Sequence, residues 1–267
     1  DAWDHSIRNN NVLSIGHVVD IIKHPRVPDR DLYVFDTKTD RQVKVVDTLG
    51  TLLYGMAVDS KGRVFIAQTD ARNDAKGRSG TKKHGLKELE NRAFLNQVTS
   101  VTFNNGEPEK PTFIDLEPLP PKHPEEDMAL ATPFAIEVTS DDSTLVVSAA
   151  GSDKIFTVDI KSGKILARVN VGAVPRGIAL ATSTDGKETH AWVLNAVANT
   201  VSLVDISNPA KLDALETIPL EDPTDAQVKR GRIAFNTAAA STTGTFSCAS
   251  CHPDGHTDQL LWVLKTP

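Results

Sequence analysis

The two cysteines of the chain lie three positions apart and are followed directly by a histidine, in Cys248-Ala249-Ser250-Cys251-His252. A CxxCH motif is typical of covalent haem attachment. Its spacing lets both thiolates add across the two vinyl groups at one edge of the porphyrin, and the next imidazole can reach the iron. We therefore predict that Cys248 and Cys251 bind one covalent haem c and that His252 is the proximal ligand of the iron. The motif leaves the identity of any catalytic residue unknown.

Two other kinds of site use the same residue types. A thioredoxin-like redox pair has a CxxC spacing too, but it normally sits in a βαβ unit, which this part of the sequence lacks. A zinc site could use both cysteines with His252 or His256, although a closed structural site needs four ligands. No second CxxC or histidine pair is nearby. Haem attachment is the favoured interpretation, and the other two remain alternatives.

A helix is expected just before the CxxCH motif. Pro223-Thr224-Asp225 is an N-terminal capping signal for a helix that runs to about Asn236. Arg232, on this helix, is a candidate partner for a haem propionate, and Phe246 and Trp262 are candidate walls of a haem pocket. One face of the helix repeats at i, i+3, i+4 and i+7, which predicts close packing against a neighbour: Val228, Gly231, Arg232 and Phe235.

The distal ligand of the iron is not evident. Met56 and Met128 are the only methionines, but Met56 lies in a strand pattern, which favours a core position. Only 15 residues follow His252, too few for the helices that normally close over a haem. We therefore expect that the chain is truncated and that the distal ligand lies in sequence beyond Pro267.

Before this helix the sequence has an all-β rhythm and an internal repeat. Short runs rich in Val, Ile, Leu, Phe and Thr alternate with turns of Asp, Gly, Ser and Asn. The run that begins at Pro133-Phe134 recurs 42 residues later at Pro175-Arg176, and Asp159 closes its unit as Asp205 closes the next. Four strands are expected in each unit, at 134–138, 144–149, 154–159 and 164–169, and at 177–181, 189–194, 200–205 and 214–219.

Related units precede these two. One is expected at 54–59, 63–67, 98–103 and 112–116, and segments 31–36 and 42–47 look like the outer strands of another. An insertion at 70–96 is interpreted as a solvated basic loop, and the proline-rich stretch 117–130 as a stiff linker. The basic residues of the insertion are Lys76, Arg78, Lys82, Lys83, Lys87 and Arg92.

Four-stranded units with a period of about 40 to 45 residues are the signature of propeller blades, of which closed propellers have about four to eight. The predicted fold class is therefore mainly β: a partial β-propeller over residues 1–220, followed at 221–267 by the start of an α-helical cytochrome c-type domain. Missing blades would come from the same chain or from another. A β-sandwich of similar hairpins is the alternative.

Two resemblances add to these expectations. Val174-Pro175-Arg176-Gly177-Ile178-Ala179 and Ala198-Asn199-Thr200-Val201-Ser202-Leu203-Val204-Asp205 resemble the YVTN-type β-propeller repeat family over roughly residues 27–220. Gly231-Arg232-Ile233-Ala234-Phe235 with Phe246-Ser247-Cys248-Ala249-Ser250-Cys251-His252 resembles the first haem domain of the di-haem cytochrome c peroxidase-like family, over 225–258. Together they resemble bacterial proteins in which such a propeller is fused to such a cytochrome domain. This implies a periplasmic or extracellular location.

Composition narrows the function classes. The net charge of −6 is spread along the chain without a polybasic arm, which argues against a nucleic-acid partner, and no apolar run is long enough to span a membrane. We expect an electron-transfer protein with a redox partner protein. The alternatives are an oxidoreductase of the di-haem peroxidase-like type, with its second haem downstream, and a propeller that serves only binding or assembly.

Overall fold

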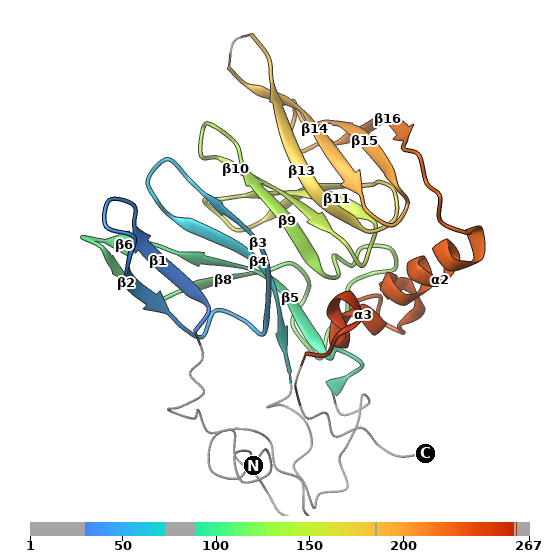
Figure 1. The fold of residues 1–267 in the computed structure, drawn as a ribbon, viewed down its shortest axis with the longest axis horizontal. Coiled ribbons are helices and arrows are strands. Elements are labelled where there is room, and N and C mark those ends of the chain that lie inside the picture. Colours follow the sequence, from blue (N-terminus) through green and yellow to red (C-terminus); the bar gives the residue numbers. More distant parts are fainter. Residues whose placement is uncertain (1–29, 73–88, 185, 259, 261–267) are drawn as a thin grey trace, which may run out of the picture.

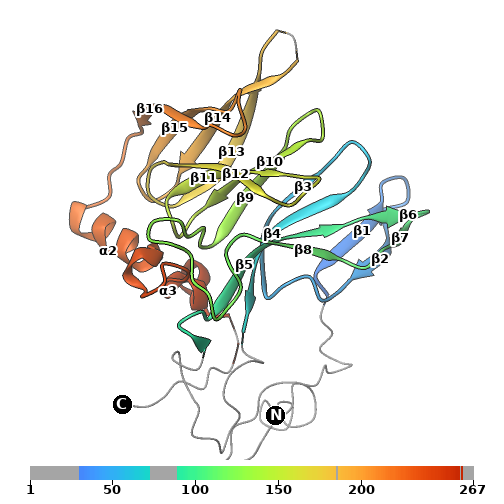
Figure 2. The same cartoon turned by 180° about the vertical axis from the view of Figure 1, so that it is seen from behind.

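A computed structural model describes residues 30–72, 89–184, 186–258 and 260. Its strands form one short two-stranded hairpin and four larger units, and these four sheets lie side by side in an open fan, with the C-terminal helices along one side of the fan (Figure 1). The view from behind shows the same arrangement (Figure 2). We name the sheets blades 1 to 4 in chain order. Every strand pairing among the described residues is antiparallel.

Blades 3 and 4 confirm the predicted four-stranded repeat. Each is a meander in which neighbouring strands follow one another in sequence. The strands of blade 3 are β9 (Pro133–Val138), β10 (Thr144–Ala149), β11 (Lys154–Asp159) and β12 (Ile165–Asn170), and those of blade 4 are β13 (Pro175–Thr182), β14 (Glu188–Asn195), β15 (Thr200–Asp205) and β16 (Asp213–Pro219).

Blade 2 is also four-stranded, in the order β3-β4-β5-β8, and blade 1 is a two-stranded hairpin. A further short hairpin, β6 with β7, lies between β5 and β8 in sequence and was not predicted. The bounds are β1 (Leu32–Asp36), β2 (Arg41–Val46), β3 (Leu52–Val58), β4 (Val64–Ala71), β5 (Phe94–Val101), β6 (Phe103–Asn104), β7 (Glu107–Pro108) and β8 (Thr112–Asp115).

The apolar alternation of the strands explains why the blades stack face to face. Strand β10 is buried on both faces: Leu145 and Val147 pack against blade 2, and Val146 packs against blade 4. Two neighbouring sheets thus share each apolar layer, as expected when strands with alternating side chains are covered on both sides. The outer strand β16 has almost no buried residue, because it lies at the rim of its sheet.

The aspartate that closes each repeat has a structural role. Asp159 Oδ1 accepts hydrogen bonds from the backbone N–H and the hydroxyl of Ser162, at 2.7 and 2.5 Å. Asp205 accepts the same pair of bonds from Ser207, at 2.8 and 2.6 Å. These local bonds lower the pKa of both carboxyl groups. The shared aspartate therefore stabilises the turn after the third strand in blades 3 and 4.

Two predicted boundaries differ from the structure. Strand β4 runs to Ala71 and β5 begins at Phe94, so the ends of the predicted insertion 70–96 belong to strands, while residues 73–88 lie outside the described residues. The predicted linker 117–130 is not a simple exposed spacer, because its two ends, Glu117 and Leu130, are buried. The buried side chains of Glu117 and Leu130 thus attach the two ends of this stretch to the blades.

After β16 the chain turns back along the fan as a helical segment, residues 225–258 (Figure 1). It contains α2 (Ala226–Asn236), η2 (Ala238–Ala240), α3 (Cys248–Cys251) and η3 (Pro253–Gly255). Helix α2 has the predicted cap, in which Asp225 accepts from the N–H groups of Gln227 and Val228. None of the helices in the described residues is long and apolar enough to cross a membrane.

Substitution of Gly55 can test the close contact between blades 2 and 3. A Cβ atom at this position would lie 2.3 Å from the carbonyl oxygen of Phe134, so Gly55→Ala must push the inner strands apart. We expect a loss of about 1–3 kcal/mol of unfolding free energy, measured by urea denaturation. Gly231→Ala on α2 is the matched control, because its Cβ would meet no atom within 4 Å. Equal stability of both variants would contradict the tight blade contact.

Candidate functional site

The CxxCH motif lies on α3, a single helical turn that ends at the histidine. Positions i and i+3 share one side of a helix, so Cys248 and Cys251 face the same way. Cys248 is exposed and Cys251 is partly exposed, whereas Ala249 and Ser250 between them are buried. The Ser247 N–H donates to Ser250 Oγ at 3.0 Å. The inward residues therefore anchor the turn and leave the two sulfur atoms on its outer side.

His252 is held in a form suited to binding a metal. Its Nδ1 lies 2.8 Å from the backbone carbonyl oxygen of His256. Because a carbonyl oxygen only accepts, Nδ1 must carry the proton, and the lone pair of the neutral ring is then on Nε2. Ligating histidines usually donate their other ring N–H in this way. The sequence alone did not reveal this hydrogen bond.

The loop after His252 makes this contact possible. Asp254 and Gly255 both have positive φ, 50° and 82°, so the backbone turns sharply there. The turn is closed by hydrogen bonds from the Gly255 N–H to the carbonyl of His252 and from the Asp258 N–H to that of Cys251. It returns the His256 carbonyl to the imidazole. His256 itself is exposed, and only its backbone is used.

Three hydrogen bonds attach the helical segment to blades 2 and 3. The Ala238 N–H donates to the carbonyl of Gly151 at 2.7 Å, and the Thr243 hydroxyl donates to that of Asn91 at 2.8 Å. Asn96, on β5, donates its side-chain amide to the carbonyl of Thr245 at 3.0 Å. Thr245, which accepts the last of these bonds, is three residues before Cys248. The CxxCH motif is thus positioned by blade 2 and blade 3.

A buried ion pair supports Asn96. Glu117 accepts from Arg92 Nη2 at 2.9 Å and from Asn96 Nδ2 at 3.1 Å, and the Leu130 N–H donates to its other oxygen at 3.0 Å. The side chains of Arg92 and Glu117 are each only 1% exposed. Burial raises the pKa of Glu117, an effect that these donors oppose. Arg92 was predicted to belong to a solvated basic loop, and this prediction was wrong because its guanidinium is paired with a buried carboxylate.

A groove beside the CxxCH motif is lined by α2, blade 4 and η3. Its volume is about 520 Å³, and its lining includes Arg176, Val197, Val228, Gly231, Phe235 and Asp254. The predicted packing face of α2 lies here, but it is open: no residue of α2 is buried, and Val228 is 55% exposed. We call this space the α2 groove. Among the described residues, this helix face has an apolar surface without the close partner that the sequence predicted.

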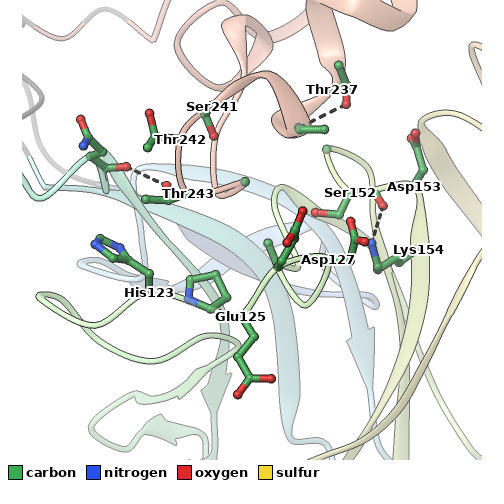
Figure 3. A pocket seen from close by; sticks show the side chains of 17 residues that line it. His123, Glu125, Asp127, Ser152, Asp153, Lys154, Thr237, Ser241, Thr242 and Thr243 are labelled. Atoms are coloured by element: carbon green, nitrogen blue, oxygen red, sulfur yellow. Dashed lines mark hydrogen bonds between the residues drawn. The ribbon is translucent and has the colours of Figure 1, made fainter.

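A second and larger groove is polar. It has a volume of about 670 Å³ and lies between the helical segment, the stretch 123–129 and the turn that joins β10 to β11. Figure 3 shows Thr237, Ser241 and Thr243 on one side of it and Glu125 and Asp127 on the other. Hydroxyl and carboxylate groups suit a porphyrin poorly, since cofactor sites are mostly apolar with a few placed polar groups. The α2 groove fits that description better.

The other predicted site residues are less clearly placed. Arg232 lines the α2 groove but is exposed, Phe246 is partly buried, and Trp262 lies outside the described residues. Met56 was predicted to be a core residue, and this was wrong because 57% of it is exposed. It lies on β3, the inner edge strand of blade 2. Met128 is also exposed.

The alternatives to haem find little support in this geometry. Helix α3 follows a sheet with only antiparallel pairings, not a βαβ unit. Within the described part of the chain, no three His, Cys, Asp or Glu side chains are grouped so as to hold a metal ion. A haem iron needs only one such ligand from the proximal side. Two thiols and one imidazole are the donor set that covalent haem attachment uses.

Comparison with known proteins bears on the fold. No family model matches the sequence, and no curated protein matches it. The structure is similar to hydrazine synthase of Kuenenia stuttgartiensis, at 15% identity and a TM-score of 0.51, over 70% of this chain and 54% of that one. It is also similar to a periplasmic gluconolactonase of Pseudomonas aeruginosa, at 17% identity and a TM-score of 0.48, over 72% and 50%.

These likenesses concern the architecture alone, because the identities are low. The chain spans about half the length of the solved structures that it matches. Hydrazine synthase is a β-propeller protein, and the repeated four-stranded antiparallel sheets of this chain agree with that architecture. The chain therefore has a mainly β fold built from the blades of a β-propeller.

Proposed function

We propose that this chain belongs to an extracytoplasmic c-type cytochrome in which a YVTN-type β-propeller precedes a haem domain, and that it transfers electrons. One observation carries the proposal: the only two cysteines lie on the outer side of one helical turn, and His252 beside them has Nδ1 engaged by the His256 carbonyl. Two thiol groups and one imidazole nitrogen thus lie within one short segment of the chain. A covalent haem uses these three atoms.

The residues of the chain have distinct tasks in this proposal. Cys248 and Cys251 would hold the haem through thioether bonds. His252 Nε2 would ligate the iron, and the His256 carbonyl fixes the orientation of the imidazole. When bound, the haem supplies one-electron redox chemistry. The blades position the motif through Asn96, Asn91 and Gly151.

The partner and location follow from the same proposal. Covalent haem proteins of the kind that the sequence resembles work outside the cytoplasm, so we propose a periplasmic or secreted protein with a redox partner protein. The sequence contains a single CxxCH motif, and the proposal is limited to one haem. The di-haem peroxidase-like alternative has no specific observation in its favour.

The decisive experiment is a pyridine haemochrome spectrum combined with denaturing mass analysis, on protein produced where cytochrome c maturation operates. We expect one covalently retained haem per chain. Cys248→Ser/Cys251→Ser should lose covalent retention completely, because no other thiol exists in the chain. Wild-type protein made without the maturation machinery is the control for unspecific haem. A wild-type protein that loses all its haem on denaturation would overturn the proposal.

A further inference from the structure

Arg176 occupies a repeated position at which the neighbouring blades carry aromatic residues. The inner strands of blades 2, 3 and 4 contain the corresponding runs Tyr54-Gly55-Met56, Phe134-Ala135-Ile136 and Arg176-Gly177-Ile178. Among these three blades, only blade 4 has a cation at this position. Blade 4 is also the blade that lines the α2 groove. The blade that has a guanidinium in place of an aromatic ring is therefore the blade that lies near the CxxCH motif.

The guanidinium of Arg176 is held in a fixed place. Its Cζ lies 4.7 Å from the centre of the Phe134 ring, which in turn lies 4.9 Å from the ring of Tyr54. Arg176 Nη1 pairs with Asp254, and Nη2 lies 3.5 Å from Asn236 Oδ1. Because Asp254 is two residues past His252, the cation stands beside the loop that carries the predicted iron ligand.

Arg176 still has hydrogen-bonding capacity. A guanidinium has five N–H donors, and its Nε is enclosed without a hydrogen-bond partner. The contact of Nη2 with Asn236 is at the limit of hydrogen-bonding distance. Arginine commonly binds a carboxylate through two parallel N–H groups. Because Nη1 and Nη2 together carry four N–H groups, these two nitrogens can bind a further anion while Nη1 keeps its pairing with Asp254.

The charge and polarity of the α2 groove indicate which anion it suits. The charged residues that line the groove are Arg176, Arg232 and Asp254. Their net charge is +1, in a chain whose net charge is −6. The rest of the lining includes apolar side chains such as Val197, Val228 and Phe235. A haem has the matching chemistry, with a flat apolar ring and two carboxylates at one edge.

From these observations we infer that Arg176, supplied by the propeller, binds a propionate of the haem that the CxxCH motif attaches. The inference rests on the proposed function and adds to it a role for blade 4. Arg232 was the candidate that the sequence suggested, but it is exposed on α2, whereas Arg176 is fixed by Phe134 and Asp254. Arg176 acts as a binding residue for the cofactor, and the propeller thereby contributes to the haem environment.

The test uses haem-loaded protein and two readouts that do not depend on activity: the reduction potential and the resonance Raman band of the propionate groups. Arg176→Gln should lower the potential, because the lost positive charge stabilised the reduced iron, and should shift the propionate band. Asp254→Asn should raise the potential. Arg232→Gln is the matched control and should change both readouts less than Arg176→Gln.

Several results would overturn the inference. If Arg176→Gln and Asp254→Asn shift the potential in the same direction, their ion pair is only a structural latch. An unchanged propionate band in Arg176→Gln, or an equal effect of Arg232→Gln, would contradict propionate binding by Arg176. If Arg176→Gln does not fold, Arg176→Lys replaces it, because lysine keeps the charge but not the planar fork. Arg176→Lys should shift the propionate band with little change in the reduction potential. An unshifted band in this variant overturns the inference. Haem content, measured on each sample, separates these results from a failure of the proposed function itself.

Discussion

Replacement of His252 by alanine is expected to remove the native ligation of the iron while both thioethers still form. The two cysteines remain on α3, so covalent retention should persist in the denatured protein. The native absorption spectrum should change completely, because the side chain that donates Nδ1–H to the His256 carbonyl and offers Nε2 to the iron is gone. The measurement is the visible spectrum of the folded protein in both oxidation states.

His256→Ala is the matched control for this variant. It removes an imidazole four residues away but keeps the backbone carbonyl that accepts from His252. Its spectrum should match that of the wild type. An unaltered native spectrum in His252→Ala would remove His252 as the ligand, and a loss of ligation in His256→Ala alone would assign the ligand to His256.

Glu117→Gln is expected to destabilise the fold by about 3–5 kcal/mol, because it leaves the guanidinium of Arg92 buried without its counter-ion. Arg92 and Glu117 are both almost fully buried and lie 2.9 Å apart. A glutamine also presents N–H donors to a site where Arg92, Asn96 and the Leu130 amide already donate. Since small domains have about 5–15 kcal/mol of stability, the loss is a large share. Urea denaturation of the two proteins measures it.

The control for this prediction is Glu109→Gln, at an exposed glutamate close in sequence. It should change the stability by less than about 0.5 kcal/mol, as surface substitutions usually do. A loss below about 1 kcal/mol in Glu117→Gln would show that the buried pair contributes little and that Asn96 does not depend on it. A loss in the expected range supports the connection between this network and the CxxCH motif.

The blade architecture was predictable because its signals are local in sequence. Alternating apolar residues define the strands of blades 3 and 4, and aspartates such as Asp159 and Asp205 mark the same turn in each unit through bonds to residues two or three positions away. The cap of α2 at Asp225 is a signal of the same kind. In each case the residue and its partner lie within a few positions of one another, so the pattern alone identifies them.

The features that were missed depend on contacts between distant parts of the chain. Nothing in the sequence near Arg92 indicates that Glu117, 25 positions later, neutralises it in the interior. Met56 fits a strand pattern, but whether a strand residue is buried depends on what covers its sheet. The hydrogen bond from Asn96 to Thr245 joins positions 149 apart. The CxxCH motif could be identified from the sequence, whereas its support by blades 2 and 3 could not.

The attachment of the helical segment to the blades has an entropic consequence. The bonds from Thr243 to Asn91 and from Asn96 to Thr245 close loops of 152 and 149 residues. Ordering a residue costs about 1–2 kcal/mol of backbone conformational entropy. The residues just before Cys248 are already ordered by these bonds when the blades fold, so much of this cost arises during folding and not during binding. The motif is thereby preorganised, so a bound group needs to order little of the surrounding polypeptide.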